Sequence, residues 1–155
     1  SRNDIDREMI LYSTWPRLFE PRGFPDEVSK VSPDFVVIYN QAAEAEAYKL
    51  HDVAGPGYRK ALEYLVKDFS IREYPYDFEA IQKMRLQAVI NKYILDENIK
   101  HCAELGWWLG NDESHYVKKW ESDLPTLKDV IQLTVNWIDN YERTKGLKMT
   151  MSEGK

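Results

Sequence analysis

An apolar stripe that recurs every three or four residues constrains the fold of this chain more than any other feature. Its most regular copy lies in 58–69, and its members are Tyr58, Ala61, Leu62, Leu65, Val66 and Phe69. This spacing is that of one face of an α-helix. Similar stripes lie in 35–45, 78–94, 99–103 and 127–138. Five stripes joined by short gaps predict an all-α bundle of five helices.

Capping and breaking residues mark the expected helix ends. Ser32 followed by Pro33 predicts the start of the first helix, because serine caps an N-terminus and proline fits the first turn. The sequence "AGPG" at 54–57 is expected to end that helix and to start the second. Asp96 and Asp123 are expected to cap the fourth and fifth helices.

These capping residues, together with the prolines and glycines, divide the chain into three regions. Residues 1–31 are predicted to be an extended arm, or the remnant of an N-terminal linker, because Pro16, Pro21, Gly23 and Pro25 fall there. Residues 32–146 form the predicted helical domain, whose last helix is expected to end at Gly146. Residues 147–155 are predicted to be a disordered tail.

Charge and composition exclude several classes of function. The formal net charge of −5 argues against a broad phosphate-binding surface. No segment approaches the roughly 20 apolar residues of a membrane span, so we expect a cytoplasmic protein without a membrane partner. Cys102 is the only cysteine and is interpreted as a small buried apolar residue. The three histidines show no metal-binding spacing, so we expect neither a metal nor another cofactor in this chain.

The stretch "WWLGNDESHYVKKW", residues 107–120, is the first candidate site. In a helix running from 108 to 115, Trp108, Asn111 and His115 would share one face. Burying the amide or the imidazole unpaired would cost about 1–3 kcal/mol. Either the two pair with each other and a carboxylate as a structural set, or they face a cleft and act in function.

Two further groups of residues are candidates. Arg59 and Glu63 lie one helical turn apart beside the second stripe, where they form a surface pair or hold the Asn111 and His115 side chains. A third group is suited to nucleic-acid contact through charge and stacking, although such residues also occur on solvated helix faces. Its members are Lys118, Lys119 and Trp120.

Three blocks of the chain together resemble the domain-of-unknown-function 4145 family. They are "SPDFVVIYNQAAEAEAYKL", "GYRKALEYLVKDF" and "LGNDESHYVKKWESDLPTLKDVIQLTVNWI", and the resemblance covers about residues 31–143. It implies a HEPN-like helical bundle, and this bundle class often forms dimers. Members of the family occur alone, behind an N-terminal zinc ribbon or fused to restriction-type enzymes, and are associated with defence against foreign nucleic acid. A zinc ribbon before residue 1 of a longer protein would explain the arm.

HEPN ribonucleases carry an arginine, often a polar residue after it, and a histidine a few residues further on, and they cleave RNA at a dimer interface without metal. On this pattern His115 takes the histidine position and Asn111 the polar one, but Gly110 stands where the arginine is expected. At this position the chain therefore lacks the cation that stabilises developing charge on the phosphate in those ribonucleases. Arg59, from the same or the partner subunit, is the candidate replacement.

The leading prediction is a non-catalytic, HEPN-like interaction domain that forms a homodimer and docks a protein or nucleic acid in nucleic-acid processing or anti-phage defence. In it, Arg59, Glu63, Asn111 and His115 form a structural lock between the second and fourth helices. The alternative is a metal-independent ribonuclease with His115 as general acid and base, Asn111 orienting and Arg59 binding phosphate. A third reading is an adaptor that positions a zinc ribbon.

Overall fold

The computed structural model describes residues 19–110 and 120–154, and within these ranges the regular structure is helical without a strand. Its elements are α2 (Asp26–Val31), α3 (Pro33–Ala47), α4 (His51–Glu73), the 3₁₀ turn η1 (Pro75–Asp77), α5 (Phe78–Lys83), α6 (Leu86–Tyr93), α7 (Glu97–Gly110) and α8 (Trp120–Glu153). The all-α prediction is confirmed. The predicted number of five helices is wrong, because α2 was not expected and the third predicted helix is divided into α5 and α6.

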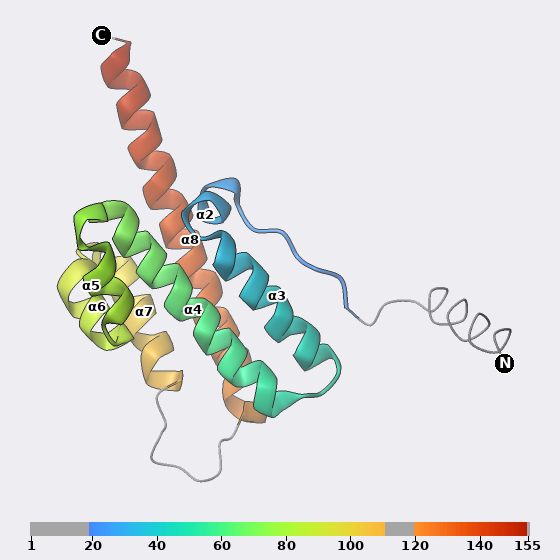
Figure 1. The fold of residues 1–155 in the computed structure, drawn as a ribbon. Helices are drawn as coiled ribbons and strands as arrows, with labels where there is room; N and C mark the ends of the chain where they lie inside the picture. Colours follow the sequence, from blue (N-terminus) through green and yellow to red (C-terminus); the bar gives the residue numbers. More distant parts are fainter. Residues whose placement is uncertain (1–18, 111–119, 155) are drawn as a thin grey trace, which may run out of the picture.

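Helix α4 lies at the centre of the bundle. Helix α3 runs beside it, α8 packs behind it, and α5, α6 and α7 gather around its C-terminal half (Figure 1). All members of the stripe in 58–69 are buried, as the sequence predicts: Tyr58, Ala61, Leu62, Leu65, Val66 and Phe69. Full burial of one large apolar side chain contributes about 1.5–3 kcal/mol, so each large member of this stripe adds to the hydrophobic stabilisation of the bundle.

Ser32 begins α3 as predicted. Its Oγ accepts a hydrogen bond from the Phe35 backbone N–H at 3.2 Å, and Pro33 occupies the first turn. The Ser32 hydroxyl also donates to Asp68 on α4, so the cap joins the two helices. Asp96 caps α7 in the same way, because its Oδ1 accepts from the Ile99 backbone N–H at 3.0 Å.

The prediction that 54–57 separates two helices is wrong. Helix α4 begins at His51 and continues through Pro56, while the chain turns earlier, at Tyr48–Leu50, where Lys49 has a φ of 60°. The second glycine of the motif serves close packing instead. A Cβ on Gly57 would lie 2.9 Å from the Cβ of Ala42, so its absence lets α3 and α4 approach.

The predicted arm at 1–31 is wrong for its last six residues, which form α2. Val28 and Val31 on this helix are both buried, because their three-residue spacing places them on the side that faces the core. Residues 19–25 have no regular secondary structure, as predicted. Arg22 anchors them: its guanidinium lies 4.3 Å from the Phe24 ring centroid and donates to Gln132 on α8.

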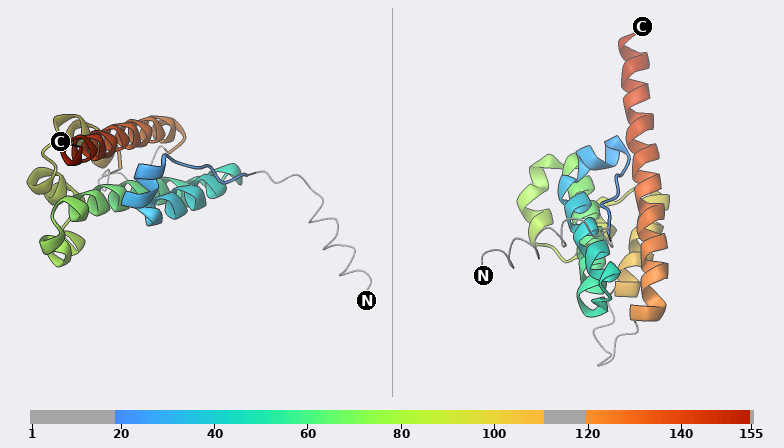
Figure 2. Two further views of the ribbon diagram at one scale, coloured as in Figure 1. Left: turned by 90° about the horizontal axis from the view of Figure 1, so that it is seen from above. Right: turned by 90° about the vertical axis from the view of Figure 1, so that its right-hand side faces the viewer.

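The prediction of a disordered tail after Gly146 is also wrong for the residues that the structure describes. Helix α8 continues through Gly146 to Glu153 and projects well beyond the other helices (Figures 1 and 2). Glu142 is its last buried residue, and every residue from Arg143 to Gly154 is exposed. We call Arg143–Glu153 the α8 extension.

Candidate functional site

Arg59 and Glu63 lie where the sequence places them, one turn apart on α4 and half-buried at the edge of the core. The Glu63 carboxylate forms an ion pair with Lys67, one further turn along the helix, at 2.8 Å between Oε1 and Nζ. Glu63 therefore forms an ion pair along α4 that the sequence analysis did not single out.

The other predicted site residues fall outside the part of the chain that the structure describes. These are Asn111, His115, Lys118 and Lys119, together with the side chain of Trp120, whose backbone begins α8. Helix α7 ends at Gly110, directly before this segment. The structural lock and the Arg59–His115 pair consequently stay predictions.

Helix α7 approaches α4 closely near its C-terminal end. A Cβ added to Gly106 would overlap Cδ2 of Leu62 and would lie 3.4 Å from Cγ1 of Val130 on α8. Gly106 thus lies where α4, α7 and α8 meet. Leu62 directly precedes Glu63 on α4, and Gly110 lies one turn beyond Gly106, so the end of α7 runs toward the stretch of α4 that carries the predicted pair.

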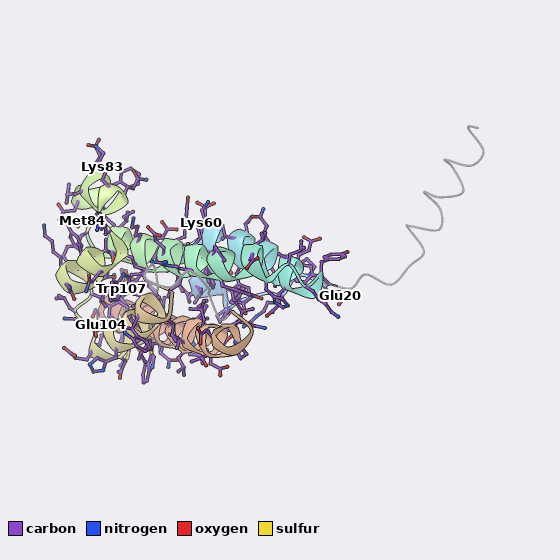
Figure 3. The ribbon with its side chains drawn as sticks, turned by 90° about the horizontal axis from the view of Figure 1, so that it is seen from below. Glu20, Lys60, Lys83, Met84, Glu104 and Trp107 are labelled. Carbon is purple, nitrogen blue, oxygen red and sulfur yellow. The ribbon has the colours of Figure 1, made fainter. Side chains whose placement is uncertain are left out.

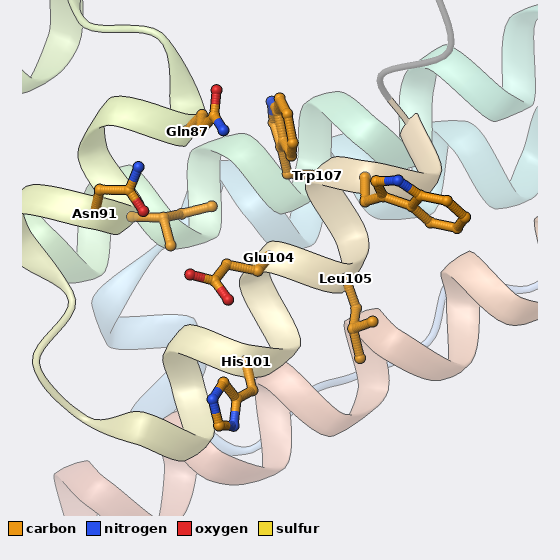
Figure 4. A pocket seen from close by; sticks show the side chains of 8 residues that line it. Gln87, Asn91, His101, Glu104, Leu105 and Trp107 are labelled. Carbon is orange, nitrogen blue, oxygen red and sulfur yellow. The ribbon is translucent and has the colours of Figure 1, made fainter.

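A groove of about 610 Å³ opens between α6 and α7. Figure 4 shows Asn91 and Glu104 pointing toward each other across it, with Gln87 and Trp107 on one side and His101 at the far end. In Figure 3, Glu104 and Trp107 lie on the α7 side of the bundle, away from Lys60 on α4. The Trp108 side chain, predicted to share a helix face with Asn111 and His115, is 70% exposed and lines this groove.

The groove residues support binding more than catalysis. Ile90, Leu105, Trp107 and Trp108 offer apolar contact, while His101 is engaged in a surface pair with Glu97 at 3.6 Å. Apolar walls with a few polar groups suit an inserted side chain. The α7 side of this groove could have been predicted from the sequence. Its residues on α7 recur at three- and four-residue spacing, on the face opposite the buried stripe of that helix.

A partly buried polar contact joins three helices and was not predicted. The Tyr58 hydroxyl on α4 donates to Glu46 on α3 at 2.9 Å, and Lys128 on α8 donates to the same carboxylate oxygen at 2.8 Å. Burial and the adjacent carboxylate raise the pKa of Tyr58, so it remains a neutral donor. This set fixes the relative positions of α3, α4 and α8 and is interpreted as structural.

Metal and thiol chemistry receive no support from the described side chains. Within 19–110 and 120–154, no three His, Cys, Asp or Glu residues gather in a group that could hold a metal ion. Cys102 is buried as expected, and burial raises the pKa of its thiol, which disfavours the reactive thiolate. In the same ranges, none of the helices has both the length and the apolar character that crossing a membrane requires.

Comparisons with protein-family models, with curated proteins and with solved structures found no match to this chain.

Proposed function

We propose that this chain is a non-catalytic, HEPN-like interaction domain that self-associates and acts in nucleic-acid processing or anti-phage defence in the cytoplasm. The observation that carries the interaction role is the α8 extension. It continues a bundle helix into solvent and carries Leu147 and Met151, each more than half exposed. Exposed apolar side chains gathered on one element mark association sites in soluble proteins.

The nucleic-acid and defence context rests on the resemblance of the three sequence blocks, and the helical architecture is compatible with it. The net charge of −5 favours a protein partner, or a nucleic acid bound at a local patch, over a broad electrostatic interface.

Two measurements test this proposal. Light scattering after size exclusion, across a range of protein concentrations, is expected to show a dimer, and a monomer at all concentrations would contradict self-association. A mobility-shift titration with RNA and DNA at low salt tests nucleic-acid contact. A shift that Lys118→Ala and Lys119→Ala weaken would support it, whereas no shift would leave protein docking as the interaction.

The approach of α7 to α4 favours a second candidate, the metal-independent ribonuclease. Leu62 packs beside Gly106, so Arg59 and the end of α7 belong to adjoining parts of two contacting helices. An Arg59 guanidinium and a His115 imidazole could together bind phosphate and move protons.

An RNA cleavage assay in EDTA distinguishes the two candidates. Cleavage lost in His115→Ala and in Arg59→Ala, but kept in the control His101→Ala, would establish the ribonuclease. The control histidine lies on the exposed face of α7, with 70% of its side chain accessible. We expect no cleavage by the unaltered protein.

A further inference from the structure

The outer face of α8 carries a second stripe with a different period from its core face. Its members are Leu133, Trp137, Asn140, Thr144, Leu147 and Met151, and we call this set the α8 seam. Successive members are separated by alternating steps of four and three residues, which is the heptad spacing of the a and d positions of a coiled coil. Four of the six are apolar, and the two polar members, Asn140 and Thr144, lie at the middle.

The seam is exposed along its whole length. Leu133 is 48% and Trp137 39% exposed within the bundle, and Leu147 and Met151 are 64% and 69% exposed on the extension. The core face of the same helix, represented by Ile131, is buried on the opposite side. A short helical segment without tertiary packing is marginal in water, so the extension gains stability by pairing its apolar face.

Heptad spacing identifies the occupant as another helix with a matching seam, and a second copy of α8 supplies one. In a parallel pair, Arg143 and Lys148 would take the flanking g and e positions and repel each other across the interface. The extension carries Arg143, Lys145 and Lys148 against Glu153, whereas the whole chain is acidic at −5. An antiparallel pair removes this contact between Arg143 and Lys148, because it lays the basic extension along the body of the second copy.

We propose that two copies of the chain associate through an antiparallel pairing of the α8 seams. One register matches every seam member: Leu133 packs on Met151 of the second copy, Trp137 on Leu147, and Asn140 on Thr144. This inference rests on the self-association proposed above and adds its surface and its orientation.

The polar layer at the centre sets the register. Thr144 Oγ1 already donates to the Asn140 carbonyl of its own helix at 2.7 Å, so its oxygen accepts from the Asn140 amide of the second copy. A slipped register would bury these groups against leucine, methionine or tryptophan. Arg143 meets its own counterpart near the two-fold axis, and Asp139, 3.9 Å away on the same helix, offsets that repulsion.

Charge substitutions on the extension test the surface without disturbing the core. Leu147→Glu and Met151→Glu each place a charge in the seam, and we expect each to raise the dimer dissociation constant about tenfold or more, since the charge is buried unpaired. Met149→Glu is the matched control, because Met149 is 59% exposed on the same turns but points away from the seam. We expect it to dimerise like the unaltered chain in analytical ultracentrifugation.

Disulfide trapping tests the orientation. An oxidised mixture of Leu133→Cys and Met151→Cys chains is expected to give a disulfide-linked dimer that contains one chain of each variant. Met151→Cys alone is expected to give little disulfide-linked dimer. Efficient crosslinking of Met151→Cys alone would show a parallel pair and overturn the proposal.

The outcomes separate this inference from the broader function. A monomeric unaltered chain would overturn both. A dimer that withstands Leu147→Glu and Met151→Glu, or that Met149→Glu weakens equally, would overturn the seam and leave self-association by another surface.

Discussion

Gly106→Ala tests whether the junction of α4, α7 and α8 requires a residue without a side chain at position 106. The new Cβ would overlap Cδ2 of Leu62, which is fully buried, and would touch Cγ1 of Val130 at 3.4 Å. Overpacking of this kind costs about 1–3 kcal/mol, and an overlap this severe belongs at the upper end. Replacing glycine by alanine inside a helix returns about 1 kcal/mol.

The two terms give a net loss of about 2 kcal/mol in the free energy of unfolding, or about 4–8 °C in Tm for a chain of this size. Urea denaturation followed by far-UV circular dichroism measures the loss as a lower midpoint with an unchanged slope. Gly146→Ala is the matched control, because nothing lies within 4 Å of a Cβ there. Gly146→Ala keeps the stability gained from higher helix propensity but introduces no steric overlap.

The control should therefore be as stable as the unaltered protein or slightly more stable. Leu62→Ala combined with Gly106→Ala should lose less than the two single changes predict, because the shorter side chain makes room for the new methyl group. If Gly106→Ala matches Gly146→Ala in stability, the close approach of α7 to α4 is wrong.

Three further substitutions probe polar contacts by the same denaturation assay. Burial raises the pKa of Asp68, so the protein loses stability as pH rises through that pKa. Asp68→Asn keeps an acceptor for the Ser32 hydroxyl but carries no charge. The variant should therefore be more stable than the unaltered chain at neutral pH and equally stable in acid. Equal differences at both pH values would contradict this. Tyr58→Phe should lose about 1 kcal/mol, because the hydrogen bond to Glu46 is removed from the interior; no loss would refute a stabilising role. Arg22→Ala should lose about 1–2 kcal/mol and speed amide exchange in 19–25, whereas unchanged exchange would show that the guanidinium does not anchor the segment.

Local signals predicted the core and two of the three caps. The predicted cap at Asp123 is wrong, because α8 begins at Trp120 and Asp123 lies inside that helix. Tyr58 and Leu62 are buried because helical spacing puts them on one face, whatever the neighbouring helices are. Ser32 and Asp96 cap their helices because a cap depends on backbone groups only two or three residues away. Such features need no knowledge of tertiary contacts.

Helix ends were predicted poorly where the same residue type serves two purposes. Gly57 looks like part of a turn, yet it is needed where α4 meets Ala42 of α3, and that contact cannot be read from neighbouring residues. Conversely, the chain turns at Lys49 without a glycine. The break between α5 and α6 at Met84 and Arg85 likewise has neither glycine nor proline to announce it.

The candidate site was predicted in part. Arg59 and Glu63 lie at the edge of the buried face as expected, but the pairing of Glu63 with Lys67 depends on which rotamers the neighbouring elements leave open. The Lys128 contact with Glu46 joins residues far apart in sequence and requires the three-helix arrangement to be known. Sequence spacing along one helix carries no information about such contacts.

The sequence does not predict the seam on α8, because glycine is typical of a helix end and Gly146 lies within the seam region. Burial within the bundle accounts for the core face of α8 only as far as Glu142. Leu147 and Met151 lie beyond that point, yet they continue the heptad that starts at Leu133 on the body of the bundle. A helix that merely ended in solvent would have no reason to keep this register across the boundary, whereas a helix that pairs along its whole outer face requires it. The continuity of the spacing, more than the exposure of any one side chain, is therefore the observation on which the proposed association through α8 rests.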